Sequence, residues 1–66
     1  MEIVYQGRTV ETDARTVQEF LAEKNVVAEK AIVEYAGEVY APGADLSVLV
    51  LQPGAALDVF KMMAGG

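Results

Sequence analysis

Apolar and polar residues alternate with a period of two in several short stretches of the chain, a pattern typical of half-buried β-strands. Near the beginning, residues 3–5 and 9–12 form two such stretches, separated by a Gln-Gly pair. Gly7 can adopt the positive φ angle that a tight hairpin turn requires. The pattern therefore predicts a first β-hairpin, whose core-facing residues are Ile3, Tyr5 and Val10.

A helical period replaces this alternation in the next part of the chain. An apolar stripe at positions i, i+3 and i+4 consists of Val17, Phe20 and Leu21. Thr16 and Glu19 have the spacing of a capping box, in which the Thr16 hydroxyl accepts from the Glu19 amide and the Glu19 carboxylate reaches back. We therefore expect an amphipathic helix that ends near Asn25, a residue that tolerates the left-handed conformation of a helix cap.

The second half of the chain returns to strand-like alternation. Residues 31–35 and 39–40 favour a second hairpin, and the Pro-Gly pair that follows ends it. Asp45 is placed to cap a single helical turn, after which three leucines return to the core: Leu46, Leu49 and Leu51. Residues 52–55 suit a type II turn. A last strand is expected over residues 57–62, with Leu57 and Val59 facing the core.

The order strand, strand, helix, strand, strand, strand predicts an α+β fold. A right-handed crossover through the helix places the first and last strands side by side. We therefore expect a β-grasp (ubiquitin-like) architecture, a mixed sheet of four to five strands with one main helix packed across it. Residues 1–66 form a single domain, and residues 63–66 are expected to be a flexible C-terminal tail.

The composition excludes several classes of function. The chain contains no cysteine and no histidine, so it has neither a disulfide framework nor a thiolate or imidazole metal site. A net charge of -5 with scattered basic residues argues against nucleic acid as a partner, and favours either a basic protein partner or solubility alone. No apolar run approaches the ~18 residues of a membrane span, and no signal peptide is apparent, so we expect no membrane association and a cytoplasmic location.

The candidate chemistry lies at the C-terminus, because the usual catalytic motifs are missing from the rest of the sequence. The chain ends in Ala64, Gly65 and Gly66. Two glycines without Cβ atoms can thread a narrow channel in a partner. The unhindered carboxylate of Gly66 can be adenylated with ATP and then converted by a sulfur nucleophile to a thiocarboxylate.

On this interpretation the chain is not an enzyme but the protein co-substrate of an adenylating and sulfur-transfer system. Gly66 carries the reactive carboxylate, and Gly65 guides it into the partner's active site. The residues before them form a partner-docking region, since exposed aromatic and methionine side chains suit adaptable interfaces: Phe60, Met62, Met63 and Ala64. The chain binds no cofactor or metal of its own, and the partner uses the ATP.

The sequence resembles the ThiS family, the sulfur carriers of thiamine thiazole synthesis. The similar segments are Ile3-x-Tyr5-x-Gly7, Thr16-Val17-x-Glu19-Phe20-Leu21, Val33-Glu34-x-x-Gly37-Glu38-Val39-x-x-Pro42, Leu51-x-x-Gly54 and Ala64-Gly65-Gly66. The resemblance covers nearly the whole chain. It implies a β-grasp fold, a ThiF-type adenylating enzyme as first partner, thiazole synthase as the recipient of the sulfur, and Gly66 as the modified residue.

The sequence also departs from the family pattern, after Pro42 and before the last strand. The family often has an aromatic residue after its proline, where this chain has Gly43-Ala44-Asp45-Leu46, and Asp-Gly-Asp where this chain has Pro53-Gly54-Ala55. These changes leave open that the chain is a ThiS-like carrier serving another sulfur pathway. Two further alternatives to the carrier function are a non-covalent β-grasp interaction module and a ubiquitin-like modifier that ends on lysine.

Overall fold

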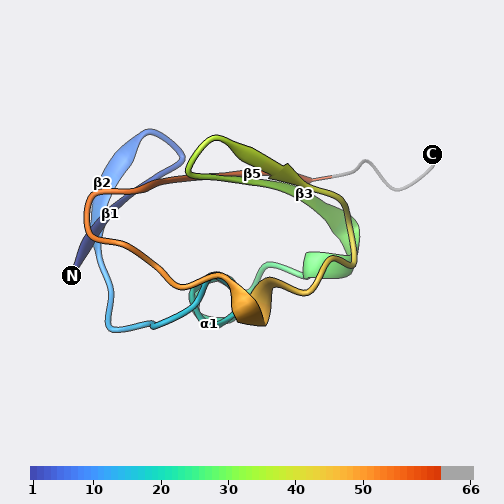
Figure 1. Cartoon of the computed structure of the whole chain (residues 1–66), viewed down its shortest axis with the longest axis horizontal. Helices are drawn as coiled ribbons and strands as arrows, with labels where there is room; N and C mark the ends of the chain where they lie inside the picture. The colour runs from blue at the N-terminus through green and yellow to red at the C-terminus, as the bar shows by residue number, and fades with distance from the viewer. Residues whose placement is uncertain (62–66) are drawn as a thin grey trace.

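The computed structural model describes residues 1–61 of the chain and shows a single sheet with one helix packed across it (Figure 1). The elements in chain order are β1 (Glu2–Tyr5), β2 (Arg8–Glu11), α1 (Val17–Glu23), the 3-10 turn η1 (Ala28–Lys30), β3 (Ala31–Tyr35), β4 (Glu38–Tyr40), the 3-10 turn η2 (Leu46–Val48) and β5 (Ala56–Lys61). Turn η1 was not predicted from the sequence. The other elements were expected, within two residues at each described end.

The sheet has five strands in the order β2-β1-β5-β3-β4, so the last strand of the chain lies at its centre. β1 and β5 run parallel, with Val4 opposite Ala56, and the other neighbours are antiparallel. The predicted adjacency of the first and last strands is therefore confirmed. This arrangement is the β-grasp fold.

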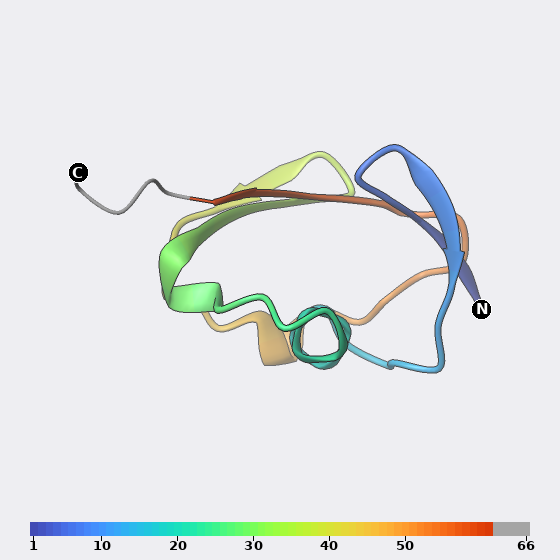
Figure 2. The ribbon, with the colours of Figure 1, turned by 180° about the vertical axis from the view of Figure 1, so that it is seen from behind.

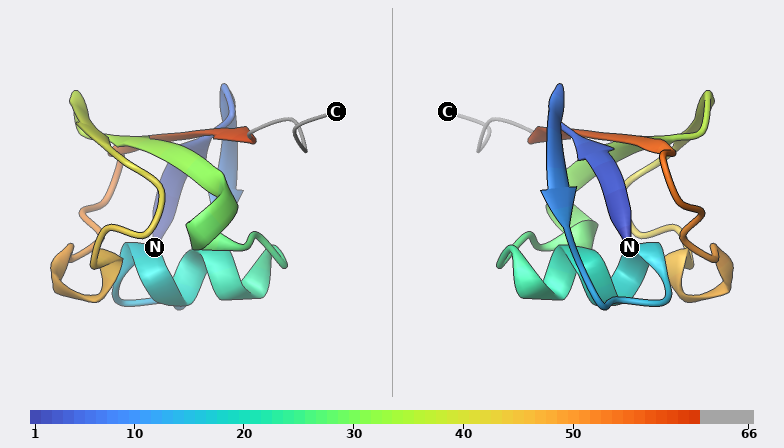
Figure 3. Two further views of the ribbon diagram at one scale, coloured as in Figure 1. Left: turned by 90° about the vertical axis from the view of Figure 1, so that its right-hand side faces the viewer. Right: turned by 90° about the vertical axis from the view of Figure 1, so that its left-hand side faces the viewer.

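Helix α1 covers one face of the sheet, and Figures 2 and 3 show that no described element lies over the other face. The core fills the space between helix and sheet and includes both α1 and strand residues. Its largest fully buried side chains are Phe20, Ile3, Leu21, Leu57, Val17 and Val33. Each such side chain contributes about 1.5–3 kcal/mol by leaving water.

The predicted helix cap is confirmed at its first bond and differs at its second. The Glu19 amide donates to the Thr16 hydroxyl over 3.1 Å, as expected. The Glu19 carboxylate, however, accepts from the amide of Arg15 over 2.8 Å, one residue before the cap. The extended backbone of Thr16 turns the preceding amide toward the carboxylate. Asn25 has a φ angle of 59° and ends the helix in the left-handed conformation, as predicted.

Two hairpins close through pairs of residues with positive φ angles. Gln6 and Gly7 have φ angles of 51° and 80°, and Ala36 and Gly37 have angles of 51° and 88°. Two consecutive positive angles define the type I′ geometry, whose twist matches that of the flanking strands. The sequence predicted this conformation for Gly7 but not for Gln6, because glutamine rarely adopts it.

The segment before β5 is tied down by a buried tyrosine. The Tyr35 hydroxyl donates to the carbonyl of Val50 over 2.9 Å and accepts from the amide of Gln52 over 2.8 Å. The predicted type II turn follows, with Ala55 donating to the Gln52 carbonyl over 3.1 Å and a φ angle of 79° at Gly54. These contacts fix the point at which the chain enters its central strand.

Candidate functional site

The described chain ends in the middle of the sheet, at the last residue of β5. β3 pairs with β5 along its length, from Tyr35 opposite Leu57 to Ala31 opposite Lys61. The backbone of β3 therefore constrains the direction of β5 as far as Lys61. The residues that follow Lys61 are those for which chemistry is predicted: Met62, Met63, Ala64, Gly65 and Gly66. All five lie outside the described residues.

The opposite edge of β5 is supported by a side chain that the sequence analysis did not single out. β1 reaches only as far as Leu57, where the amide of Gln6 donates to the Leu57 carbonyl over 3.0 Å. Two residues further on, Gln6 Nε2 donates to the Val59 carbonyl over 3.0 Å, and Gln6 Oε1 accepts from the Val59 amide over 2.8 Å. The side-chain amide of Gln6 therefore continues the pairing of β1 with β5 toward the C-terminal end of β5. It bonds the backbone of Val59 as the backbone of a further strand residue would.

Phe60 is the described member of the predicted docking region. Its side chain is 55% exposed, on the sheet face that α1 leaves uncovered, opposite Ile32 of β3. The prediction that Phe60 is exposed is confirmed. Met62, Met63 and Ala64, the other members of that region, lie outside the described residues.

The surroundings of the end of β5 are positively charged on the helix side. Lys61 and Lys30 both line a hollow of about 220 Å³, together with Asn25, Val26 and Val27. Val27 is 54% exposed. Because Ala31, the partner of Lys61, belongs to the core, strand alternation directs Lys61 toward the helix side and Phe60 away from it.

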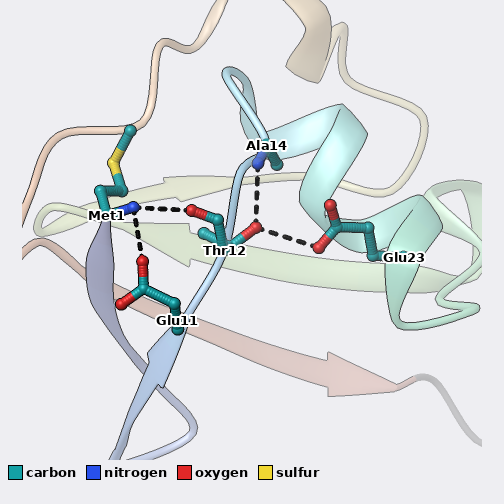
Figure 4. A network of polar contacts seen from close by, with 5 residues as sticks. All are labelled: Met1, Glu11, Thr12, Ala14 and Glu23. Atoms are coloured by element: carbon teal, nitrogen blue, oxygen red, sulfur yellow. Dashed lines mark hydrogen bonds and ion pairs between the residues drawn. The ribbon is translucent and has the colours of Figure 1, made fainter.

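A polar network lies at the opposite end of the molecule, where β2 runs into the loop before α1 (Figure 4). The buried Thr12 hydroxyl donates to the Glu23 carboxylate over 3.0 Å and accepts from the Ala14 amide over 3.0 Å. The Met1 amine donates to Glu11 over 2.9 Å and to the Thr12 carbonyl over 2.8 Å. This hydrogen bond to the Glu11 carboxylate raises the pKa of the Met1 amine.

This network was not predicted from the sequence. No local pattern indicates that the Thr12 side chain is buried, or that its hydroxyl bonds Glu23, a residue 11 positions later in the sequence. Figure 1 places the beginning of the chain and the end of β5 at opposite ends of the molecule. The network therefore supports the fold and does not contact the candidate site.

Neither a metal-binding cluster nor a membrane-spanning helix is found in the described part of the chain. Within residues 1–61 no group of three or more acidic side chains is arranged to hold a metal ion. Over the same range, no helix is both long and apolar enough to cross a membrane. The described feature that bears on the predicted site is the central position of β5, the strand that precedes it.

The fold and the central position of its last strand define a small ubiquitin-like protein of the β-grasp class. No model of a known protein family matches the sequence, and no curated protein matches it. Among solved structures, the crystal structure of the thiamine biosynthesis protein ThiS from Geobacter metallireducens matches with a TM-score of 0.76 and 30% sequence identity, over 100% of both chains. The chain belongs to the ThiS family.

Proposed function

We propose that this protein is a sulfur carrier of thiamine biosynthesis, in which the carboxylate of Gly66 carries the sulfur. The observation that supports this proposal most strongly is the full-length match to a ThiS protein described as a thiamine biosynthesis protein. The Gly-Gly sequence at the end of the chain adds to it, because only Met62, Met63 and Ala64 separate it from the central strand β5. The chain acts as a co-substrate and leaves catalysis to its partners.

The proposed chemistry has two steps, both catalysed by a ThiF-type adenylating enzyme. The Gly66 carboxylate attacks the α-phosphorus of ATP and pyrophosphate leaves, which gives an acyl-adenylate. Sulfur at the oxidation level of sulfide, supplied as HS⁻, then attacks the carbonyl carbon and AMP leaves. The product is a thiocarboxylate, whose sulfur passes to the thiazole precursor on thiazole synthase, the second partner.

The proposal gives separate roles to the body and the tail. Five residues follow Lys61. Fully extended, they span about 17 Å, which is the furthest that the Gly66 carboxylate can reach from the sheet. The body must therefore dock within that distance of the nucleotide. Phe60 on the uncovered face would contact the partner first, with Met62, Met63 and Ala64 continuing the contact and Gly65 passing into the active site.

Intact mass spectrometry tests the proposal directly. Incubation with the adenylating enzyme, ATP and a sulfide source should exchange one oxygen atom for sulfur and raise the mass of the chain by that difference. Deletion of Gly66, or addition of one alanine after it, should abolish the exchange, since the first removes the carboxylate-bearing glycine and the second converts its carboxylate to an amide.

Gln18→Ala provides a matched control, because it changes an exposed side chain of α1 and leaves the terminal carboxylate intact. This control should still be modified once folding has been verified by circular dichroism. A chain that keeps its mass with a competent enzyme is not a sulfur carrier. If the same chain still binds its partners after deletion of Gly66, the interaction-module alternative is favoured instead.

A further inference from the structure

The uncovered face of the sheet, which we call the outer face, has a distinct chemistry. Strand registers place ten side chains on it: Glu2, Val4, Thr9, Glu11, Ile32, Glu34, Val39, Ala56, Asp58 and Phe60. The two basic residues of the described strands, Arg8 and Lys61, are paired with Tyr5 and Ala31, which pack toward the helix. The charged residues of the outer face are therefore all acidic.

Two of these carboxylates lie directly opposite each other at the centre of the sheet. Glu34 of β3 is the register partner of Asp58 of β5, and both side chains are half-buried. Directly opposed residues have Cβ atoms about 4.5–5.5 Å apart, and like charges at that separation destabilise the sheet. No described basic residue forms an ion pair with either carboxylate. The free protein therefore carries an unfavourable charge pair in its most constrained element.

Apolar side chains border this acidic pair. Phe60 and Ile32 form the next register pair toward the end of β5, and Val39 lies across from Glu34. Phe60 is 55% exposed and Val39 is 66% exposed. Exposed aromatic side chains are enriched among the residues that contribute most to the binding energy of interfaces, so Phe60 is a suitable anchor beside the half-buried acidic pair. Phe60 directly precedes Lys61, the last described residue, so a partner seated on these side chains also lies at the C-terminal end of β5.

We propose that the outer face docks the adenylating partner through an apolar recess that takes Phe60 and an arginine or lysine that inserts between Glu34 and Asp58. This inference rests on the proposed carrier function and specifies the partner's chemistry. An arginine fits best, because its planar fork can donate to both carboxylates at once. Insertion of the cation relieves the repulsion that the free protein carries.

The same charges argue against a second copy of this chain as the occupant. A symmetric contact between two outer faces would bring the Glu34 and Asp58 pairs of both copies together, with no basic residue of the described strands to neutralise them. Sedimentation equilibrium should therefore give a monomer. A dimer that Phe60→Ser disrupts would contradict the proposal, since it would assign the face to self-association.

The experiment compares the full chain with the double variant Glu34→Gln, Asp58→Asn. Its matched control is Asp13→Asn, Glu29→Gln, which removes two exposed carboxylates away from the outer face. Binding to the adenylating enzyme is measured by titration calorimetry at low and high salt. The outer-face variant should bind about tenfold or more weakly, with a flatter salt dependence, because it has lost a charge-assisted contact. The control should bind like the wild type.

A second readout separates docking from a structural role. Neutralising the opposed carboxylates should raise the thermal midpoint of the free protein by roughly 2–4 °C while it weakens binding. A lower midpoint, or a dissociation constant equal to that of the control, overturns the inference.

Sulfur loading distinguishes failure of the docking inference from failure of the carrier function. If the wild type accepts sulfur and the double variant does so with the same KM, the docking inference fails and the carrier function stands. If deletion of Gly66 leaves the modification unchanged, the carrier function fails, and the docking inference falls with it.

Discussion

At the scale of single residues, the side chain of Gln6 shows how a turn residue can stabilise a strand that lies far from it in the sequence. Both of its amide atoms bond the backbone of Val59, 53 positions later. Gln6→Asn keeps the tolerance for a positive φ angle but shortens the side chain by one methylene, so both bonds are lost. We expect the free energy of unfolding to fall by about 1–2 kcal/mol, measured by urea denaturation.

Hydrogen exchange localises this effect to the strand. The Val59 amide should exchange faster in Gln6→Asn than in the wild type by more than the loss of global stability explains. Gln18→Asn, on the exposed face of α1, is the matched control and should leave the Val59 amide protected. Equal protection of Val59 in all three proteins would show that the Gln6 side chain does not hold the strand in solution.

Asp45 gives a prediction about pH at the same scale. Hydrogen bonds from the hydroxyl and the amide of Ser47 lower the pKa of the Asp45 carboxyl below its ordinary value of 3.8. A depressed pKa in the folded state means that the carboxylate stabilises the fold above pH 3.8, and that this contribution disappears as the pH falls through the lower folded value. The stability difference between the wild type and Asp45→Ala should therefore be present at neutral pH and vanish in strong acid, as measured by urea denaturation across the pH range. A constant difference would contradict this cause.

At the scale of elements, helix α1 is short, with 7 residues, and depends on its cap. Thr16→Ala removes the hydroxyl that accepts from Glu19 and should lower the free energy of unfolding by about 1 kcal/mol. Thr16→Ser keeps the hydroxyl and should restore most of the difference, as measured by urea denaturation. Equal loss in both variants would assign the effect to the Thr16 methyl group.

The same scale shows what the sequence could predict. The period of the apolar residues was sufficient for every strand and for α1, since side-chain alternation directly reflects which face is buried. Local spacing also identified the caps at Thr16 and Asp45. The positive φ angle of Gln6 and the burial of Thr12 were not predictable, because both are imposed by contacts with residues distant in the sequence. The outer-face pairing of Glu34 with Asp58 requires the strand register, which no local pattern contains.

At the scale of the whole molecule, stability and the proposed carrier function should be separable, because their residues lie at opposite ends. Thr12→Val preserves shape but leaves the Ala14 amide without its acceptor, so it should lower the free energy of unfolding by about 1–3 kcal/mol. Phe60→Ala removes a side chain that is 55% exposed and should change stability little. Sulfur loading should change in one variant only. Phe60→Ala raises the KM for the adenylating enzyme about tenfold, whereas folded Thr12→Val is loaded like the wild type. Steady-state loading assays below the unfolding temperature, with folded fractions measured by circular dichroism, make this comparison. An equal rise in KM for both variants would mean that Phe60 acts through the fold, and the outer face would no longer be needed to explain docking.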